Sequence, residues 1–269
     1  MFEKRSFNKL EIMRKIIAFI TVIAVSLTSV AQDASSGPEF RKHRFGLKGT
    51  PGVSYFTMGK SGSKNKSIGY HIAGGLNYEY SLSKSTAIAT GVLFSKTTGG
   101  VSYTDTVGLD FSWTSGGETL SDEAFMLLSR NYVFRSVDIP LKLKFRAAEV
   151  GYFTYYGEFG VTANIITKAT AKNNDVIMEQ GKPKSTISEN EGRFDANDET
   201  KFYRGAINFG AGVEWNLVGN TSLLLGANAN IPFTNLLTSQ SETISYINGG
   251  GFARATKLNY IALQIGIQF

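Results

Sequence analysis

The sequence predicts an all-β fold, an eight-stranded antiparallel up-and-down transmembrane β-barrel, and three observations support this prediction. Apolar and polar residues alternate over long segments, which is the pattern of strands whose two faces meet different surroundings. The connections between these segments are short and long in turn. An export signal precedes the first segment, so the chain is expected to leave the cytoplasm.

The export signal lies in residues 13–31, which read MRKIIAFITVIAVSLTSVA. Two basic residues precede an apolar run, and Ser29-Val30-Ala31 forms a small-x-small cleavage site. The run is too short to cross a bilayer as a helix, which takes about 20 residues; a buried core helix is the alternative. Translation is expected to start at Met1 or at Met13. The expected domains are a signal peptide at 1–31, a polar leader at 32–42 and the β-barrel at 43–269.

Eight segments with β character follow the leader, with approximate bounds 43–58, 67–80, 85–98, 131–146, 150–168, 201–217, 221–236 and 255–269. Alternation is clearest in the last segment, and the third is ambiguous. Soluble sandwiches alternate as well, but their strands usually have about 5 or 6 residues. The segments here are long enough for tilted strands that cross a bilayer, which need about 9 to 11 residues.

The connections after the second, fourth and sixth segments are tight: Ser81–Lys84, Ala147–Glu149 and Val218–Asn220. The other connections are long and polar. Outer-membrane barrels have short periplasmic turns and long outer loops, and an even number of strands places both termini on the periplasmic side. We therefore expect a location in the cell outer membrane, with periplasmic termini.

Aromatic residues gather near the ends of the segments, as expected of side chains at two membrane interfaces. Toward the short turns these are Tyr78, Tyr80, Phe145, Phe153, Trp215 and Phe269. Toward the long loops they are Tyr55, Phe56, Tyr132, Phe134, Phe202 and Tyr203.

Composition excludes several classes of protein. The chain has no cysteine, which rules out a disulfide scaffold and thiolate metal sites. The net charge of +6 includes the basic residues of the export signal, and no basic stripe is interleaved with aromatics. Nucleic-acid binding is therefore not expected.

Several stretches carry a family resemblance: HRFGLKGTPGVSYF, GYHIAGGLNYEYSLSKSTAIATGVLFSK, RSVDIPLKLKFR, YFTYYGEFGVTANIITK, GAINFGAGVEW and KLNYIALQIGIQF. In this order they resemble the PorT-type outer-membrane β-barrel proteins common in the Bacteroidetes. The resemblance implies an integral outer-membrane barrel without catalytic residues. It also implies a place in a family of which a few members act in protein secretion.

The end of the chain resembles the signal that the barrel-assembly machinery reads. The matching positions are Leu263, Ile265, Ile267 and Phe269. The assembly machinery is therefore an expected partner, together with outer-membrane lipid.

The polar faces of the segments carry charges of both signs: Glu79, Asp138, Lys142, Lys144, Arg146, Glu158, Arg204 and Glu214. An eight-stranded barrel is just wide enough for side chains to fill it. We expect these residues to form a paired polar network in the lumen, because buried charges need partners. A narrow conduit and an acid/base site are the alternatives.

Three other motifs point only weakly to chemistry. His43 and His71 could belong to a lipid-modifying hydrolase, but no nucleophile is fixed beside either, and zinc-ligand spacing is absent. Gly210-x-Gly212 lacks the third glycine of a nucleotide loop. Asp195–Glu199 lacks the central glycine of a calcium loop. We expect His71 to be a hydrogen-bonding lumen residue, and no catalytic, cofactor or metal residues.

The connection at 99–130 contains an apolar cluster. Ser121–Ala124 is typical of a helix start, and Phe125–Leu128 follows it. Such a cluster has to pack somewhere, so we expect it to cover the barrel mouth or to contact a partner or lipid headgroups.

These observations favour a non-enzymatic barrel with a structural or interaction role, in protein secretion or envelope assembly, with an envelope protein as a candidate partner. The alternatives are a narrow small-solute channel and an outer-membrane lipid-modifying enzyme.

Overall fold

The computed structural model describes residues 42–59, 63–103, 107–109, 113–115, 118–120, 125–179, 182–187, 194–217, 221–237, 244–246 and 256–269. All of them belong to a unit that runs from Arg41 to Phe269. The predicted signal peptide and the leader up to residue 41 lie outside the described residues, as do Ser121–Ala124 and Val218–Asn220. Among the described residues, no helix is long and apolar enough to span a membrane.

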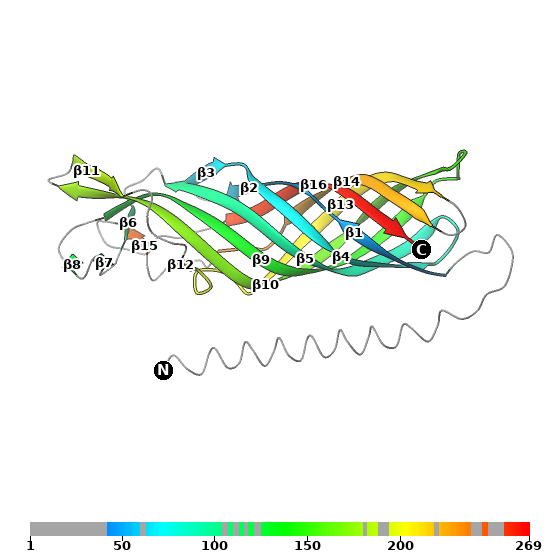
Figure 1. Cartoon of the computed structure of the whole chain (residues 1–269), viewed down its shortest axis with the longest axis horizontal. Coiled ribbons are helices and arrows are strands. Elements are labelled where there is room, and N and C mark those ends of the chain that lie inside the picture. Colours follow the sequence, from blue (N-terminus) through cyan, green and yellow to red (C-terminus); the bar gives the residue numbers. More distant parts are fainter. Residues whose placement is uncertain are drawn as a thin grey trace, which may run out of the picture. The chain divides into compact units, whose positions relative to one another are not determined.

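The strands of this unit form a closed antiparallel ring (Figure 1). In order around the ring they are β1 (His43–Gly49) with β2 (Gly52–Met58), β4 (Gly69–Ser81), β5 (Thr86–Tyr103), β9 (Phe125–Arg146), β10 (Phe153–Glu179), β13 (Tyr203–Asn216), β14 (Ser222–Pro232) and β16 (Thr256–Gln268). The ring closes because β16 pairs with β14 on one side and with β1 and β2 on the other. Since β1 and β2 continue one another, the predicted eight-stranded barrel is confirmed.

The first strand is divided at Thr50 and Pro51, where one continuous segment was predicted. Pro51 has no N–H to give to the ladder, which favours a break at this point. The neighbouring groups stay bonded nevertheless: Thr50 N–H donates to the Ala73 carbonyl at 2.8 Å, and Leu263 N–H donates to the Pro51 carbonyl at 2.8 Å. The ring therefore remains closed across the break, as a membrane requires of backbone groups.

Strand β4 ends beside the start of β5, β9 beside that of β10 and β13 beside that of β14, and these strand ends lie at the same end of the barrel (Figure 1). The ends of β1 and β16 lie there too, since Phe45 and Phe269 exchange backbone hydrogen bonds of 3.2 and 2.7 Å. We call this the short-turn end.

Strands β9 and β10 extend far beyond the predicted segments, to 22 and 27 residues. They stay paired from Arg146 opposite Tyr156 to Phe125 opposite Ile177. At about 3.3 Å per residue, β10 is about 90 Å long, more than twice the length needed to cross a bilayer. The two strands therefore form a long ribbon beyond the membrane.

Further short strands lie between the long ones, so the predicted long loops are partly β-structure. They are β3 (Ser63–Ser67), β6 (Val107–Leu109), β11 (Lys182–Ile187), β12 (Phe194–Asp195) and β15 (Ile244–Tyr246), and β7 (Trp113–Ser115) pairs with β8 (Glu118–Leu120). The expected helix start, Ser121–Ala124, lies outside the described residues, and Phe125–Leu128, expected to follow it, are strand. These residues begin β9, where pairing with β10 satisfies their backbone groups.

The alternation of the sequence corresponds to burial. In β4, Tyr70, Ile72 and Leu76 are exposed on the outside, whereas His71 and Glu79 are buried inside. The segment that was ambiguous in the sequence is β5. Its inward residues include small apolar side chains such as Ala87 and Ala89, so they contrast little with the outward ones.

The predicted outer aromatic group is partly wrong. Tyr55, Phe202 and Tyr203 are exposed, but Phe56, Tyr132 and Phe134 are buried inside the barrel, with exposures of 3%, 1% and 2%. The reason is parity, because Tyr132 and Phe134 share the inward face of β9 with Asp138 and Lys142. These three aromatic residues fill the barrel instead of facing lipid headgroups.

Candidate functional site: the barrel interior

The charged residues nearest the short-turn end form one connected group around two carboxylates. Lys144 Nζ lies 2.7 Å from Glu79 Oε1 and 2.5 Å from Glu214 Oε1. Arg146 bonds to both carboxylates, with its Nε 2.9 Å from Glu214 Oε1. Arg44 Nη1 lies 2.8 Å from Glu214 Oε2. All five side chains are at most 14% exposed, so we call them the two-glutamate layer.

The strands bring this layer together because the residues between them are small. Glu79 on β4 and Lys144 on β9 are separated by β5, which contributes Ala87 and Ala89 to the same inner face. Lys144 lies directly opposite Ala87. The missing side-chain volume lets the lysine reach across β5 to the carboxylate.

A second group lies around Glu158. Lys142 Nζ is 2.7 Å and Lys48 Nζ 3.7 Å from Glu158 Oε1, and Gln264 Nε2 donates to the same oxygen at 2.6 Å. Tyr156 separates the two groups and receives Lys144 Nζ over its ring, 4.2 Å from the centroid.

Gly210 and Gly212, which had been considered as part of a nucleotide loop, make room for these groups. A Cβ atom at Gly210 would lie 2.9 Å from the Glu158 carboxylate. A Cβ atom at Gly212 would lie 2.7 Å from the Tyr156 hydroxyl. Both glycines are within β13, so a strand continues where a nucleotide loop would need a helix.

Two of the eight predicted lumen residues, Asp138 and Arg204, are buried but lie outside these ion pairs. Asp138 accepts a hydrogen bond from Ser136 Oγ at 2.8 Å. Arg204 donates to Asn164 Oδ1 at 3.1 Å and to the Leu258 carbonyl at 3.0 Å. Within the described ranges, neither takes part in an ion pair of 4.0 Å or less.

The two histidines are separated by the barrel wall. His71 is buried, with Nδ1 2.8 Å from Thr97 Oγ1, Nε2 3.4 Å from Thr50 Oγ1, and its ring stacked 3.8 Å from that of Tyr260. His43 is exposed and bonds to the Tyr78 hydroxyl. Neither hydrogen bond of His71 joins it to a carboxylate, so the described residues form no Ser-His-Glu arrangement around it.

The other end of the interior is apolar. Its core consists of Phe56, Val101, Tyr103, Tyr132, Phe134, Ile166, Ala169, Ala171, Ala196, Leu236, Leu237 and Leu258. Two connecting segments, 196–201 and 233–237, contribute to it and bond to one another: Lys201 N–H donates to the Leu236 carbonyl at 2.8 Å. We call this group the apolar cap. A cover of this kind was one of three alternatives that the sequence offered for the connection at 99–130, of which Val101 and Tyr103 belong to the apolar cap.

A buried ion pair lies within the apolar cap. Arg130 Nη1 is 2.5 Å from Glu199 Oε2, and the Tyr132 hydroxyl is 3.3 Å from the same oxygen. The Asp195–Glu199 segment thus turns its oxygens to separate partners, since Asp195 and Asn197 accept hydrogen bonds from backbone N–H groups. The described residues contain no group of three or more His, Cys, Asp or Glu side chains that could hold a metal ion.

Sequence reasoning missed four of the charged residues, namely Arg44, Lys48, Arg130 and Glu199. Arg44 and Lys48 alternate with Phe45 and Leu47, so their parity was a usable signal. Arg130 and Glu199 lay in segments read as loops, where no parity applied.

Between the two ends, a cavity of about 10 Å³ is lined by Lys48, Asp138 and Tyr260, among others. This is about the room that one water molecule needs.

A closed ring of eight strands with an apolar exterior and a charged, filled interior defines an integral outer-membrane β-barrel. A family model described as the outer membrane protein beta-barrel domain matches residues 30–238, and the chain belongs to this family. Its location is the outer membrane.

Solved structures with a similar fold include three outer-membrane proteins. Neisserial surface protein A (NspA) has 9% identity and a TM-score of 0.40, covering 83% of this chain and 95% of its own. Ail of Yersinia pestis has 14% identity and a TM-score of 0.38, covering 85% of this chain and 100% of its own. OprG of Pseudomonas aeruginosa has 11% identity and a TM-score of 0.39, covering 85% of this chain and 97% of its own. No curated protein sequence matches the chain.

Proposed function

We propose that this outer-membrane barrel is non-enzymatic, conducts no solutes, and has a structural or interaction role in protein secretion or envelope assembly. The observation that carries the proposal is the filling of the interior. The two-glutamate layer occupies the short-turn end, and the apolar cap occupies the other. A solute would have to separate buried ion pairs and displace packed apolar side chains, and both changes cost several kcal/mol.

The interaction role rests on the ribbon formed by β9 and β10. A barrel that served only to span the membrane would not need strands of 22 and 27 residues. Paired strands beyond the membrane offer backbone edges and side chains to a partner, and an envelope protein is the partner we propose. The finer assignment to PorT-type proteins rests on the sequence stretches quoted above.

Planar-bilayer recording of the purified full chain tests the closed lumen. We expect no steady open events for the natural protein. The matched variant replaces Glu79, Glu214, Lys144 and Arg146 by serine and Leu236 and Leu237 by alanine, which removes side-chain volume at both ends without changing net charge. Heat-modifiable gel mobility checks that this variant is folded before it is recorded. Open events only in this variant support the proposal. Steady open events in the natural protein would favour the small-solute channel.

Photo-crosslinking in intact cells tests the interaction role. A crosslinking amino acid at Leu128, exposed on β9, should capture a discrete envelope protein, whereas one at Ser83 in a short turn serves as the control. Identical capture from both positions, or none from Leu128, would contradict the role of the ribbon. Turnover of a lipid or peptide substrate that is lost on His71→Ala would revive the enzyme alternative.

A further inference from the structure

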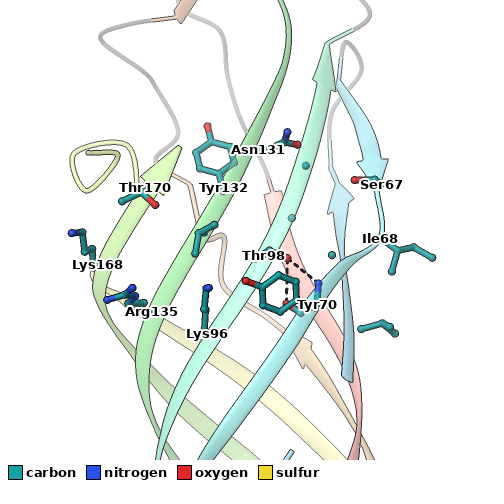
Figure 2. A pocket seen from close by; sticks show the side chains of 15 residues that line it. Ser67, Ile68, Tyr70, Lys96, Thr98, Asn131, Tyr132, Arg135, Lys168 and Thr170 are labelled. Carbon is teal, nitrogen blue, oxygen red and sulfur yellow. Dashed lines mark hydrogen bonds between the residues drawn. The ribbon is translucent and has the colours of Figure 1, made fainter. Parts of the chain in front are cut away.

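Three cationic side chains form a row on the outer wall of the barrel. Lys96 on β5 lies directly opposite Arg135 on β9, and Arg135 lies directly opposite Lys168 on β10. Figure 2 shows the three side chains side by side at one level, each from its own strand. Neighbouring strands are about 4.8 Å apart, so the row spans about 10 Å. We call it the cation row.

A β-bulge brings Lys168 into the row. The pairing of β9 with β10 shifts between Ile166 and Lys168, with Thr167 as the extra residue. Before the shift, odd-numbered residues of β10 such as Val161 face outward; after it, Lys168 faces outward and Ala169 is buried. Without the bulge, Lys168 would point into the apolar cap. Bulges of this kind re-aim side chains at functional places.

The cation row is not neutralised within the described part of the chain. No carboxylate there forms an ion pair of 4.0 Å or less with Lys96, Arg135 or Lys168. The charged contact of Lys96 is with an aromatic ring, since its Nζ lies 5.4 Å from the centroid of Tyr70. Like charges directly opposite one another destabilise a sheet. A bound anion would remove this repulsion.

The cation row lies at the boundary between apolar and polar wall. On the short-turn side, the next outward residues are Phe94 on β5, Val137 on β9 and, beyond the bulged Thr167, Ile165 on β10. On the other side they are the polar residues Thr98 and Thr170 together with Val133. From Phe145 to Arg135 is ten residues, or about 25 Å of height for a strand tilted by about 40°. That is the usual height of the lipid-facing band, so the row lies at the level of the outer headgroups.

An open groove of about 900 Å³ lies over the cation row. Lys96, Arg135 and Lys168 line it together with the apolar side chains of Val53, Ile68 and Tyr70. Cationic and apolar surfaces within one groove are complementary to an amphiphile with an anionic head. We propose that the groove binds a phosphorylated lipid of the outer leaflet, with phosphate on the cation row and acyl chains along Phe94 and its apolar neighbours.

The test measures lipid retention by native mass spectrometry of the full chain, isolated from outer membranes in a neutral detergent. The probes are bis-phosphorylated lipid A, the neutral lipid phosphatidylcholine, and inorganic phosphate as a competitor. The variant carries Lys96→Gln, Arg135→Gln and Lys168→Gln. The control carries Lys42→Gln, Lys84→Gln and Lys201→Gln, three exposed lysines with the same total change in charge.

We expect retention of one lipid A per chain, at least ten-fold weaker binding in the cation-row variant, and natural binding in the control. Phosphatidylcholine should bind weakly to all three proteins. The Arg135→Lys variant keeps the positive charge and should retain lipid A near the natural level. This result would show that lost binding in the cation-row variant comes from lost charge and not from misfolding, which heat-modifiable gel mobility also monitors. Equal binding by the variant and the control would overturn the proposal. Displacement of lipid A by millimolar phosphate would assign the site to the free anion and overturn its lipid occupant.

Discussion

Replacing Glu214 by glutamine should strongly destabilise the barrel, because the side chain is 3% exposed and receives three cations. In the natural two-glutamate layer, Arg44, Lys144 and Arg146 face Glu79 and Glu214, which leaves one excess positive charge. In Glu214→Gln the same three cations face one carboxylate. Breaking a buried pair in this way costs about 3–5 kcal/mol of the free energy of unfolding.

The assay is equilibrium unfolding in urea, with the protein in lipid vesicles, followed by tryptophan fluorescence and gel mobility. Glu149→Gln is the matched control, because Glu149 is exposed in a short turn. It should change the free energy of unfolding by no more than about 0.5 kcal/mol. If Glu214→Gln destabilises the barrel no more than this control, the two-glutamate layer does not stabilise the interior.

A second variant tests whether charge balance is the cause. Glu214→Gln combined with Arg146→Met leaves two cations facing one carboxylate, so the excess returns to one positive charge. The double variant should therefore be less destabilised than the sum of the two single changes, by about 1–3 kcal/mol. Simple additivity would show that the residues act independently.

Three further changes address other parts of the structure. Leu237→Ala in the apolar cap, at 0% exposure, should cost about 2–5 kcal/mol of unfolding free energy, against almost nothing for the exposed Leu82→Ala. Gly212→Val should prevent folding into vesicles, because its Cβ atom would lie 2.7 Å from both the Tyr156 hydroxyl and the Gly226 Cα; a normal folded yield would contradict this. Phe269→Ala should slow assembly in cells, measured by pulse-chase of the heat-modifiable form, but barely change the stability of the purified barrel. Equal slowing by Phe153→Ala, an aromatic residue near the same end, would show that the end of the chain carries no special signal.

The sequence predicted the barrel because lipid outside and polar contacts inside impose opposite demands on alternate residues. This contrast was strong in β4 and β16 and weak in β5, where small alanines face inward. The contrast between outward and inward residues could not locate the ends of β9 and β10. Beyond the membrane these strands pair mainly with one another, so no lipid contact marks where they stop.

The interior was predictable as a set of residues but not as a set of contacts. The parity of Glu79, Lys144 and Glu214 placed all three inside. Which carboxylate meets which cation depends on the stagger between strands and on the small residues of β5, neither of which parity contains. The same parity places Tyr132 and Phe134 inside. Aromatic residues near strand ends, however, are typical of a membrane interface, and the sequence prediction followed that preference instead.

The bulge at Thr167 illustrates a further limit. One extra residue reverses the outward and inward faces of the residues that follow, from Lys168 to Lys172. The cation row therefore depends on a feature that no alternating pattern in the sequence reveals.

Thiol accessibility inside the barrel tests the closed lumen most directly, and a chain without cysteine suits it. Asn208→Cys would place one thiol on the inner face at a position that is 1% exposed, and Ser83→Cys would place one in an exposed turn. With a small water-soluble thiol reagent and the protein in lipid vesicles, we expect rapid labelling at position 83 and none at position 208 until the barrel unfolds. Labelling of the folded barrel at position 208 at a rate near that of position 83 would show a water-filled lumen and contradict the account.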